Sequence, residues 1–454
     1  MVKRADWVPV VSGALVIGVL AWAGRFPWGD APGLLGTAAA TARAPWAPFG
    51  QVIPHPPMGY LLSSWPWLLG FGEWAPLLAA VPALALVWWG MRQLTDAIPW
   101  PAWCVFLATP LTWGAVNNLE WDLLLAALVT GALGAMRRER MILAGLLISA
   151  AALTKLSAPI YLALPAAWVL FTRRNPRLLV AFVGLPWFLW HHQELLAYLS
   201  PSLAGDEQVQ VAGVGDPLTS IAALRTAIGW PLLALVTLGV ARGLRSAPMV
   251  ALSALGGLAL LSTLVWQEAR YLLPVLPALL VLAERGLGRF RPLLALALVQ
   301  FAFSAWNFSP AGRGYIQPYL DFSLMGWNWP TTPRQFHPLE ASLEAWRVDE
   351  VLDGLEMDEV VAFRLPPDPS LPIAEFYQLR AEQRGLDPQF VAVEPVHGER
   401  PLPWGSTAWS QLYVMQRGPG GRTPEGLTEL WSHALPENWT GVLYTRATGP
   451  EPQP

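Results

Sequence analysis

Long apolar stretches separated by short polar connections run through the chain as far as Trp306. A bilayer core of roughly 30 Å is crossed by about 20 apolar residues in a helix, and lipid offers the backbone no hydrogen-bond partners. The composition agrees, because 54% of the residues are hydrophobic and only 13% are charged, far from the balance of a soluble domain. We therefore predict a polytopic α-helical membrane protein with about eleven transmembrane helices.

The predicted spans have boundaries that are loose by several residues. They are Val8 to Gly24, Trp74 to Met91, Trp100 to Val116, Leu119 to Met136, Met141 to Leu153, Ser157 to Phe171, Leu178 to Trp190, Ile221 to Val240, Met249 to Trp266, Tyr271 to Leu282 and Leu293 to Trp306.

Clusters of basic residues fall on alternate connections, for example Lys3-Arg4, Arg137-Arg138 and Arg173-Arg174. Basic connections face the cytoplasm by the positive-inside rule, so the other connections and everything after Trp306 face outward. This predicts an integral protein of the plasma (inner) membrane with an extracytoplasmic C-terminus. The first span also imitates a cleavable signal peptide, but we expect the helix to be retained because the loop after it needs tethering at the membrane.

The composition changes after Trp306, where prolines, charges and short alternating runs appear. Residues 359–363 and 389–393 read as strands, and residues 373–384 between them as a helix. The chain thus divides into a transmembrane core, residues 1–308, and an extracytoplasmic α/β domain, residues 309–454. The second domain carries no phosphate loop, metal-ligand spacing or nucleophile motif, and we expect it to bind or position an acceptor.

The first outer connection, residues 25–73, is too long for a simple turn between helices, and loops of that length usually carry function. It contains His55-Pro56-Pro57 just before an apolar helical stretch, Met58 to Leu69. Proline is tolerated in a first helical turn, whose free N–H groups favour an anion, and a histidine there adds a donor or a charge. The pattern predicts a phosphate site at the membrane surface.

Several motifs in order resemble one known family. They are an aspartate soon after the first span, "HPPMGYLLSSWPWLLGFGEWAPLL", "NNLEWDLLLAAL", "LAGLLISAAALTKLSAPIYLALP" and "ARYLLPVLPALLVL". The resemblance is to the GT-C membrane glycosyltransferases of the protein mannosyltransferase and aminoarabinose transferase type, and it covers Val8 to about Leu282.

The resemblance implies an enzyme that transfers a sugar from a polyprenyl-phosphate donor on the outer membrane face, with an inverting mechanism. It assigns Asp30 as the catalytic base and Asp122 as a second catalytic aspartate that orients the groups around it. It assigns His55, Lys155 and Arg270 as contacts of the carrier phosphate. One departure from the family pattern is that Asp30 is followed by Ala31 rather than by a glutamate.

The same residues stand out without the resemblance, because Glu120 and the five residues just named all fall at outer ends of spans or in the outer loop. Ionisable groups at membrane depth are functional candidates by default. The chemistry needs a base for the acceptor and cations for the leaving phosphate.

Each residue also has a structural interpretation. Asp30 is a suitable helix cap, His55 an interfacial side chain and Lys155 a snorkelling one. Asp122 could pair with Lys155 or Arg270 only to neutralise charge.

Three other groups of side chains deserve separate interpretation. His191, His192 and Glu194 resemble a metal cluster, but neighbouring histidines point to different helix faces, and Asp206 and Glu207 are the nearby carboxylates. Glu268 is interpreted as an ion-pair partner of Arg270. The Tyr377, Arg380 and Arg384 stripe is interpreted as a solvated helix face. No metal site is predicted, and the open alternative is a divalent metal held by Asp122.

The predicted partners are a polyprenyl-phosphate sugar, a lipid, glycan or protein acceptor, and membrane lipids, with no nucleic acid. A transporter or flippase of lipid-linked substrates is the alternative class, although it predicts broken helices and inverted internal symmetry, which the sequence does not display. A non-catalytic assembly protein of the same fold is the third class, and the missing Asp-Glu pair is its best argument.

Overall fold

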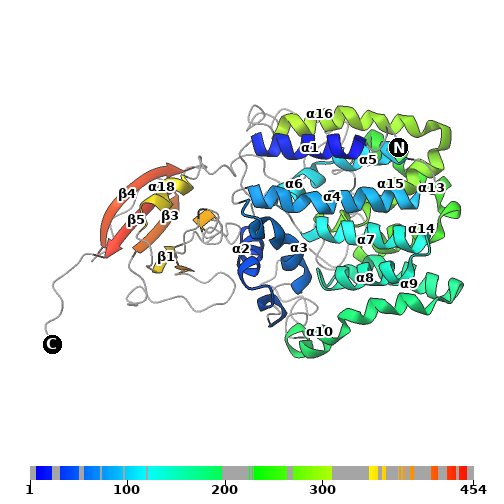
Figure 1. The fold of residues 1–454 in the computed structure, drawn as a ribbon. Helices are drawn as coiled ribbons and strands as arrows, with labels where there is room; N and C mark the ends of the chain where they lie inside the picture. Colours follow the sequence, from blue (N-terminus) through cyan, green and yellow to red (C-terminus); the bar gives the residue numbers. More distant parts are fainter. Residues whose placement is uncertain are drawn as a thin grey trace.

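The computed structural model describes residues 7–22, 31–50, 56–71, 74–95, 98–118, 121–196, 224, 228, 230–262, 269–308, 347–355, 360–364, 377, 380–381, 384, 389–392, 411–417, 427–435 and 439–446. Helices run side by side in a bundle, α2 and α3 lie at one end of it, and a small sheet lies beyond that same end (Figure 1).

In chain order the helical elements are α1 (Val8–Trp22), α2 (Ala31–Arg43), η2 (Ala47–Gly50), α3 (Pro57–Leu68), α4 (Ala75–Leu94), α5 (Trp100–Ala108), α6 (Pro110–Asn118), α7 (Trp121–Arg137), α8 (Met141–Ala152), α9 (Ala158–Arg173), η4 (Pro176–Gly184), α10 (Leu185–Trp190), α13 (Trp230–Gly243), η5 (Leu244–Ser246), α14 (Pro248–Leu261), η6 (Ala269–Leu272), α15 (Leu276–Leu287), η7 (Gly288–Leu296) and α16 (Ala297–Phe308).

Prolines account for the main differences from the predicted spans. The span predicted from Trp100 is two helices, because Thr109 precedes Pro110 and is extended, with ψ 134°, and a residue before proline is pushed out of the α region. The span predicted from Tyr271 is also interrupted. Its helix α15 begins only at Leu276, with a proline in its first turn. The span predicted from Leu178 is largely the 3₁₀ segment η4.

Within the described residues, α4 alone is long and apolar enough to cross a bilayer by itself, and residues 111–117 and 121–137 satisfy the same test together. Five further helical segments are apolar but shorter: residues 9–22, 141–152, 158–173, 176–190 and 248–261. Helices thus occupy each predicted span, while the number of about eleven crossings stays a prediction.

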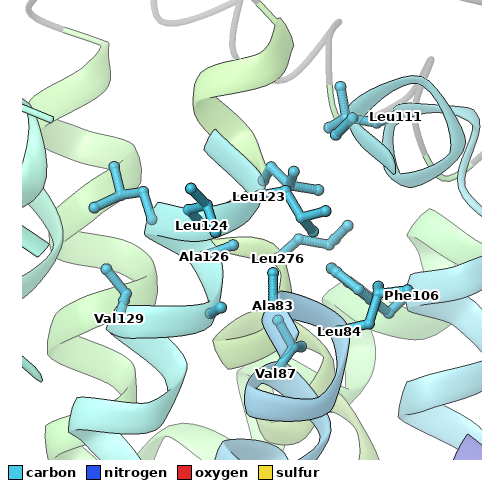
Figure 2. Packing of buried hydrophobic residues seen from close by; sticks show 14 of the residues in the cluster. Ala83, Leu84, Val87, Phe106, Leu111, Leu123, Leu124, Ala126, Val129 and Leu276 are labelled. Carbon is cyan, nitrogen blue, oxygen red and sulfur yellow. The ribbon is translucent and has the colours of Figure 1, made fainter. Parts of the chain in front are cut away.

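Close backbone contacts hold the bundle together. A Cβ atom added to Gly90 of α4 would lie 2.5 Å from the Thr130 backbone of α7, and one added to Gly286 of α15 would lie 1.7 Å from the Gly239 carbonyl oxygen of α13. Small residues let membrane helices approach in this way. Between these contacts, buried apolar side chains of α4, α5, α6, α7 and α15 gather around the first turns of α7 (Figure 2).

Arginines on the connections predicted to be cytoplasmic bind the ends of helices. Arg285 donates to the Leu94 carbonyl at 2.8 Å, Arg138 to the Thr95 carbonyl at 3.1 Å, and Arg173 to the Met136 carbonyl at 3.1 Å. The last carbonyls of a helix lack partners within it and carry partial negative charge. These cations therefore stabilise the helix C-termini whatever their role in orientation.

The C-terminal part contains α18 (Val348–Asp353) and one mixed sheet of order β2-β1-β3-β5-β4. Its strands are β1 (Val360–Arg364), β2 (Gln389–Ala392), β3 (Gln411–Arg417), β4 (Leu427–Leu435) and β5 (Trp439–Arg446). Strand β1 pairs in parallel with β2 and β3, whereas β5 pairs antiparallel with β3 and β4. Both predicted strands are present, and their parallel pairing fits the predicted strand, helix, strand order.

The stripe that we interpreted as solvated is only partly so: Tyr377 is buried, Arg380 is half-buried and Arg384 is exposed. Tyr377 is fully buried with its hydroxyl 3.2 Å from that of Tyr413, and burial raises the pKa of both phenols. Arg380 donates to both carboxylate oxygens of Asp349 at 3.0 and 3.3 Å. Arg384 forms ion pairs with α18 as well. The prediction of a solvated face is therefore wrong for Tyr377, whereas Arg384 is exposed and both arginines pair with acidic residues of α18.

Candidate functional site

Asp122 lies in the first turn of α7, and only 1% of its side chain is exposed. A carboxylate near a helix N-terminus is stabilised by the helix dipole, but a buried charge still needs partners. Its Oδ1 atom is buried and accepts no hydrogen bond among the described residues. Its Oδ2 atom faces two cations that come from other parts of the chain.

The first cation is Lys155, in the turn between α8 and α9. Its Nζ atom lies 2.6 Å from Asp122 Oδ2, and 11% of its side chain is exposed. The turn is fixed because the Lys155 N–H donates to the Ala151 carbonyl and the Lys155 carbonyl accepts from the Ala158 N–H. The ammonium also lies 4.7 Å from the centre of the Tyr271 ring. The lysine thus points into the protein, which contradicts a snorkelling role.

The second cation is Arg270, in η6 just before α15. Its Nε atom lies 3.8 Å from Asp122 Oδ2, and 12% of its side chain is exposed. Two hydrogen bonds position this segment: the Tyr161 hydroxyl donates to the Tyr271 carbonyl at 2.9 Å, and Ser253 donates to the Tyr161 carbonyl at 2.9 Å. Helices α9 and α14 therefore hold the arginine beside α7.

The first turn of α3 packs against this cluster. The Met58 N–H donates to the Leu153 carbonyl at 2.9 Å, two residues before Lys155. The Tyr60 ring meets the Trp121 ring edge-on, with centroids 4.3 Å apart, and a Cβ atom at Gly59 would lie 2.7 Å from the Trp121 ring. Only glycine fits there, so the helix that begins after Pro56 lies directly beside the residue preceding Asp122.

Three of the five predicted site residues are thus brought together: Asp122, Lys155 and Arg270. Asp30 and His55 lie outside the described residues, as do Glu120 and Glu268. The described start of α3 has an extended Pro56 and a proline in its first turn, as predicted. One of its N–H groups, that of Met58, is already used by Leu153.

The histidine pair at the end of α10 separates as predicted. The Nε2 atom of His191 lies 2.9 Å from the Phe49 carbonyl, whereas His192 is exposed and its Nδ1 atom lies 3.0 Å from the Leu189 carbonyl. Glu194 is 3.8 Å from His191. Asp206 and Glu207 are outside the described residues. No group of three or more metal-binding side chains occurs in the described part of the chain, and metal use stays an open prediction.

Two aromatic residues of this region were missed from the sequence. Tyr271 contributes the ring near both Lys155 and Arg270, whose guanidinium carbon is 5.7 Å from the ring centre. Trp121, the residue before Asp122, packs against Gly59 and Tyr60 of α3. Each is the immediate neighbour of a predicted charged residue. For Tyr271 the available signal was its place beside a predicted cation, because aromatic faces stabilise cations.

Comparisons with known proteins give one structural match. No protein-family model matches the chain, and no curated protein matches it in sequence. A solved structure is similar along almost the whole length: the crystal structure of ArnT from Cupriavidus metallidurans bound to undecaprenyl phosphate, with a TM-score of 0.60 and 16% sequence identity over 98% of this chain and 99% of that chain. The chain therefore has the polytopic helical GT-C fold of ArnT, which the motif resemblance predicted.

Proposed function

We propose that this protein is an integral membrane glycosyltransferase of the plasma (inner) membrane. It transfers a sugar from a polyprenyl-phosphate donor to a lipid, glycan or protein acceptor on the outer face. The single observation that carries the proposal is the cluster in which Lys155 and Arg270 both face the buried carboxylate of Asp122. The fold shared with ArnT, which was crystallised with undecaprenyl phosphate, supports the choice of carrier.

The charge of the cluster suits a phosphate. Among the described residues, two cations face one carboxylate at a place where each side chain is at most 12% exposed. Electrostatic interactions are much stronger in such surroundings than in water, and charge-assisted hydrogen bonds to phosphate are among the strong ones. A phosphate between Lys155 and Arg270 would receive charge-assisted hydrogen bonds from both cations.

The roles follow from the transfer chemistry. Breaking the bond between sugar and phosphate builds negative charge on the leaving phosphate, which Lys155 and Arg270 stabilise in the transition state. His55, at the start of α3, adds a third donor to the phosphate. Asp122 orients the two cations, or holds a divalent metal if one is used. Asp30 removes the proton from the attacking acceptor, and an inverting displacement results when it stands opposite the phosphate.

The test presents purified protein with a panel of radiolabelled polyprenyl-phosphate sugars and measures transfer or hydrolysis. We expect release of label from at least one donor, and Lys155→Met to abolish it. Arg177→Met removes an exposed cation from a predicted cytoplasmic connection and serves as the matched control, with activity unchanged. Donor binding without any release would favour the non-catalytic assembly protein. Movement of intact donor across a vesicle membrane would favour the flippase.

A further inference from the structure

The backbone carbonyl of Phe49 receives two side chains from a distant part of the chain. His191 Nε2 lies 2.9 Å from it, and Trp187 Nε1 donates to it at 3.3 Å. A carbonyl oxygen can only accept, so His191 carries its proton on Nε2. Both side chains are almost fully buried, at 4% exposed for His191 and 9% for Trp187. Segment η2, in the outer loop, is thereby tied to α10.

The contacts around Phe49 and Trp187 extend to the start of α3. Leu153, Trp187 and Leu195 form a separate buried apolar cluster, against which Phe49 and Met58 pack. Met58 also donates its N–H to the Leu153 carbonyl at 2.9 Å. Lys155 follows Leu153 by two residues, so one cluster joins η2, the first turn of α3 and the turn that presents the lysine.

We propose that His191 is a positioning residue that, together with Trp187, fastens the outer loop to α10 and thereby sets the first turn of α3 beside Lys155. The inference rests on the proposed function in one respect, namely that this turn contacts the carrier phosphate. His191 acts through the Phe49 carbonyl and does not touch the substrate.

The geometry also separates His191 from its neighbour. His192 is exposed and hydrogen-bonds within its own helical turn, to Leu189. Replacing it removes an imidazole without loosening the loop. It is the matched control for every measurement on His191, because the two residues differ in what they contact and not in side-chain chemistry.

The first test measures the dissociation constant for undecaprenyl phosphate in detergent, with thermal unfolding recorded in parallel. His191→Ala should weaken binding by about 3- to 10-fold, the range for one lost hydrogen bond. His191→Gln keeps an N–H donor at nearly the same reach and should restore binding to within about 2-fold. His192→Ala should bind like wild type. Equal weakening by Ala and Gln, or a lower melting temperature with unchanged binding, would overturn the proposal.

A second readout needs no ligand. Pro48 is buried in η2, so a Pro48→Cys substitution in a Cys104→Ala background should label slowly with a thiol reagent. We expect His191→Ala to speed this labelling by at least about 3-fold, as one lost hydrogen bond allows, and His192→Ala to leave it unchanged. Unchanged labelling in His191→Ala would refute the fastening even if donor transfer is found. Faster labelling without donor transfer by the wild-type protein would leave the fastening standing and refute the proposed function.

Discussion

The Nζ atom of Lys155 lies 2.6 Å from Oδ2 of Asp122, although 33 residues separate them in the chain. Arg270 reaches the same oxygen from a third segment, with its Nε atom 3.8 Å away. Intramembrane charges are normally paired, and among the described residues two cations share this one carboxylate. The cluster joins three segments of the bundle, and it is the phosphate site that we propose.

Asp122→Asn should destabilise the protein strongly. The substitution leaves two buried cations without their carboxylate, and breaking a buried pair costs about 3–5 kcal/mol. Thermal unfolding in detergent measures the loss. Glu139→Gln is the control, because it breaks an ion pair with Arg173 in which Glu139 is 74% exposed, and such pairs contribute about 0–1 kcal/mol. Equal shifts for both variants would show that the buried pair is not structural.

The double variant Asp122→Asn, Lys155→Met refines this prediction. Removing both charges of a pair is far less costly than removing one, so the double variant should regain part of the lost stability. It should not bind the donor, because it lacks Lys155. Recovery of both properties would mean that Lys155 serves only to neutralise Asp122, which was the structural interpretation of the pair.

Asp30→Asn should leave donor binding nearly intact and abolish transfer. A catalytic base acts in the transition state, so its removal lowers turnover without weakening ground-state binding. Turnover and donor affinity are measured on the same preparation. Full activity of the variant would point to another base. The assignment needs this test because Ala31 follows Asp30 where the family that the chain resembles has a glutamate.

Much of the fold could be predicted because long apolar stretches indicate helices and alternating runs indicate strands. Each predicted span contains described helix, and the strands at residues 360–364 and 389–392 fall where alternation predicted them. The Asp122 pairing was foreseen as one of two interpretations, since charges at one membrane level have few other partners.

Other features depend on contacts that leave little trace in the sequence. The hydrogen bonds to the Phe49 carbonyl join residues 142 and 138 positions apart, and a backbone carbonyl has no sequence signature. Strands β3 to β5 were not predicted either: β4 ends at Leu435 and pairs with β5, which begins at Trp439, and only the pairing of β3 with β5 joins more distant segments. Tyr377 was misread as solvated because Tyr413, against which it packs, comes from a distant segment.

Membrane orientation is tested by thiol labelling in intact cells. Single cysteines at Gln335 and Asn175, in a Cys104→Ala background, lie on connections predicted to face outward and inward by the arginine pattern. Gln335→Cys should react with an impermeant reagent, and Asn175→Cys should react only after the cells are opened. Equal labelling at both positions in intact cells would overturn the orientation and the outer-face location of the site.

His55→Ala should weaken binding of undecaprenyl phosphate by about 1–3 kcal/mol, the usual size of a lost charge-assisted hydrogen bond. The histidine precedes the first turn of α3, which packs beside Trp121 and Leu153. Equilibrium binding to the purified protein measures the change, and His192→Ala is the exposed-histidine control. If His55→Ala binds like wild type, the start of α3 does not contact the carrier phosphate.

The most direct measurement compares binding of undecaprenyl phosphate and undecaprenol, which differ only in the phosphate, to the wild type and to Lys155→Met. If Lys155 and Arg270 form a phosphate site, the wild type should bind the phosphate at least about 10-fold more tightly than the alcohol, the effect of about 1.4 kcal/mol. In Lys155→Met most of that preference should disappear. Equal affinity of the wild type for both lipids, or an undiminished preference in the variant, would show that Lys155 and Arg270 do not form a phosphate site.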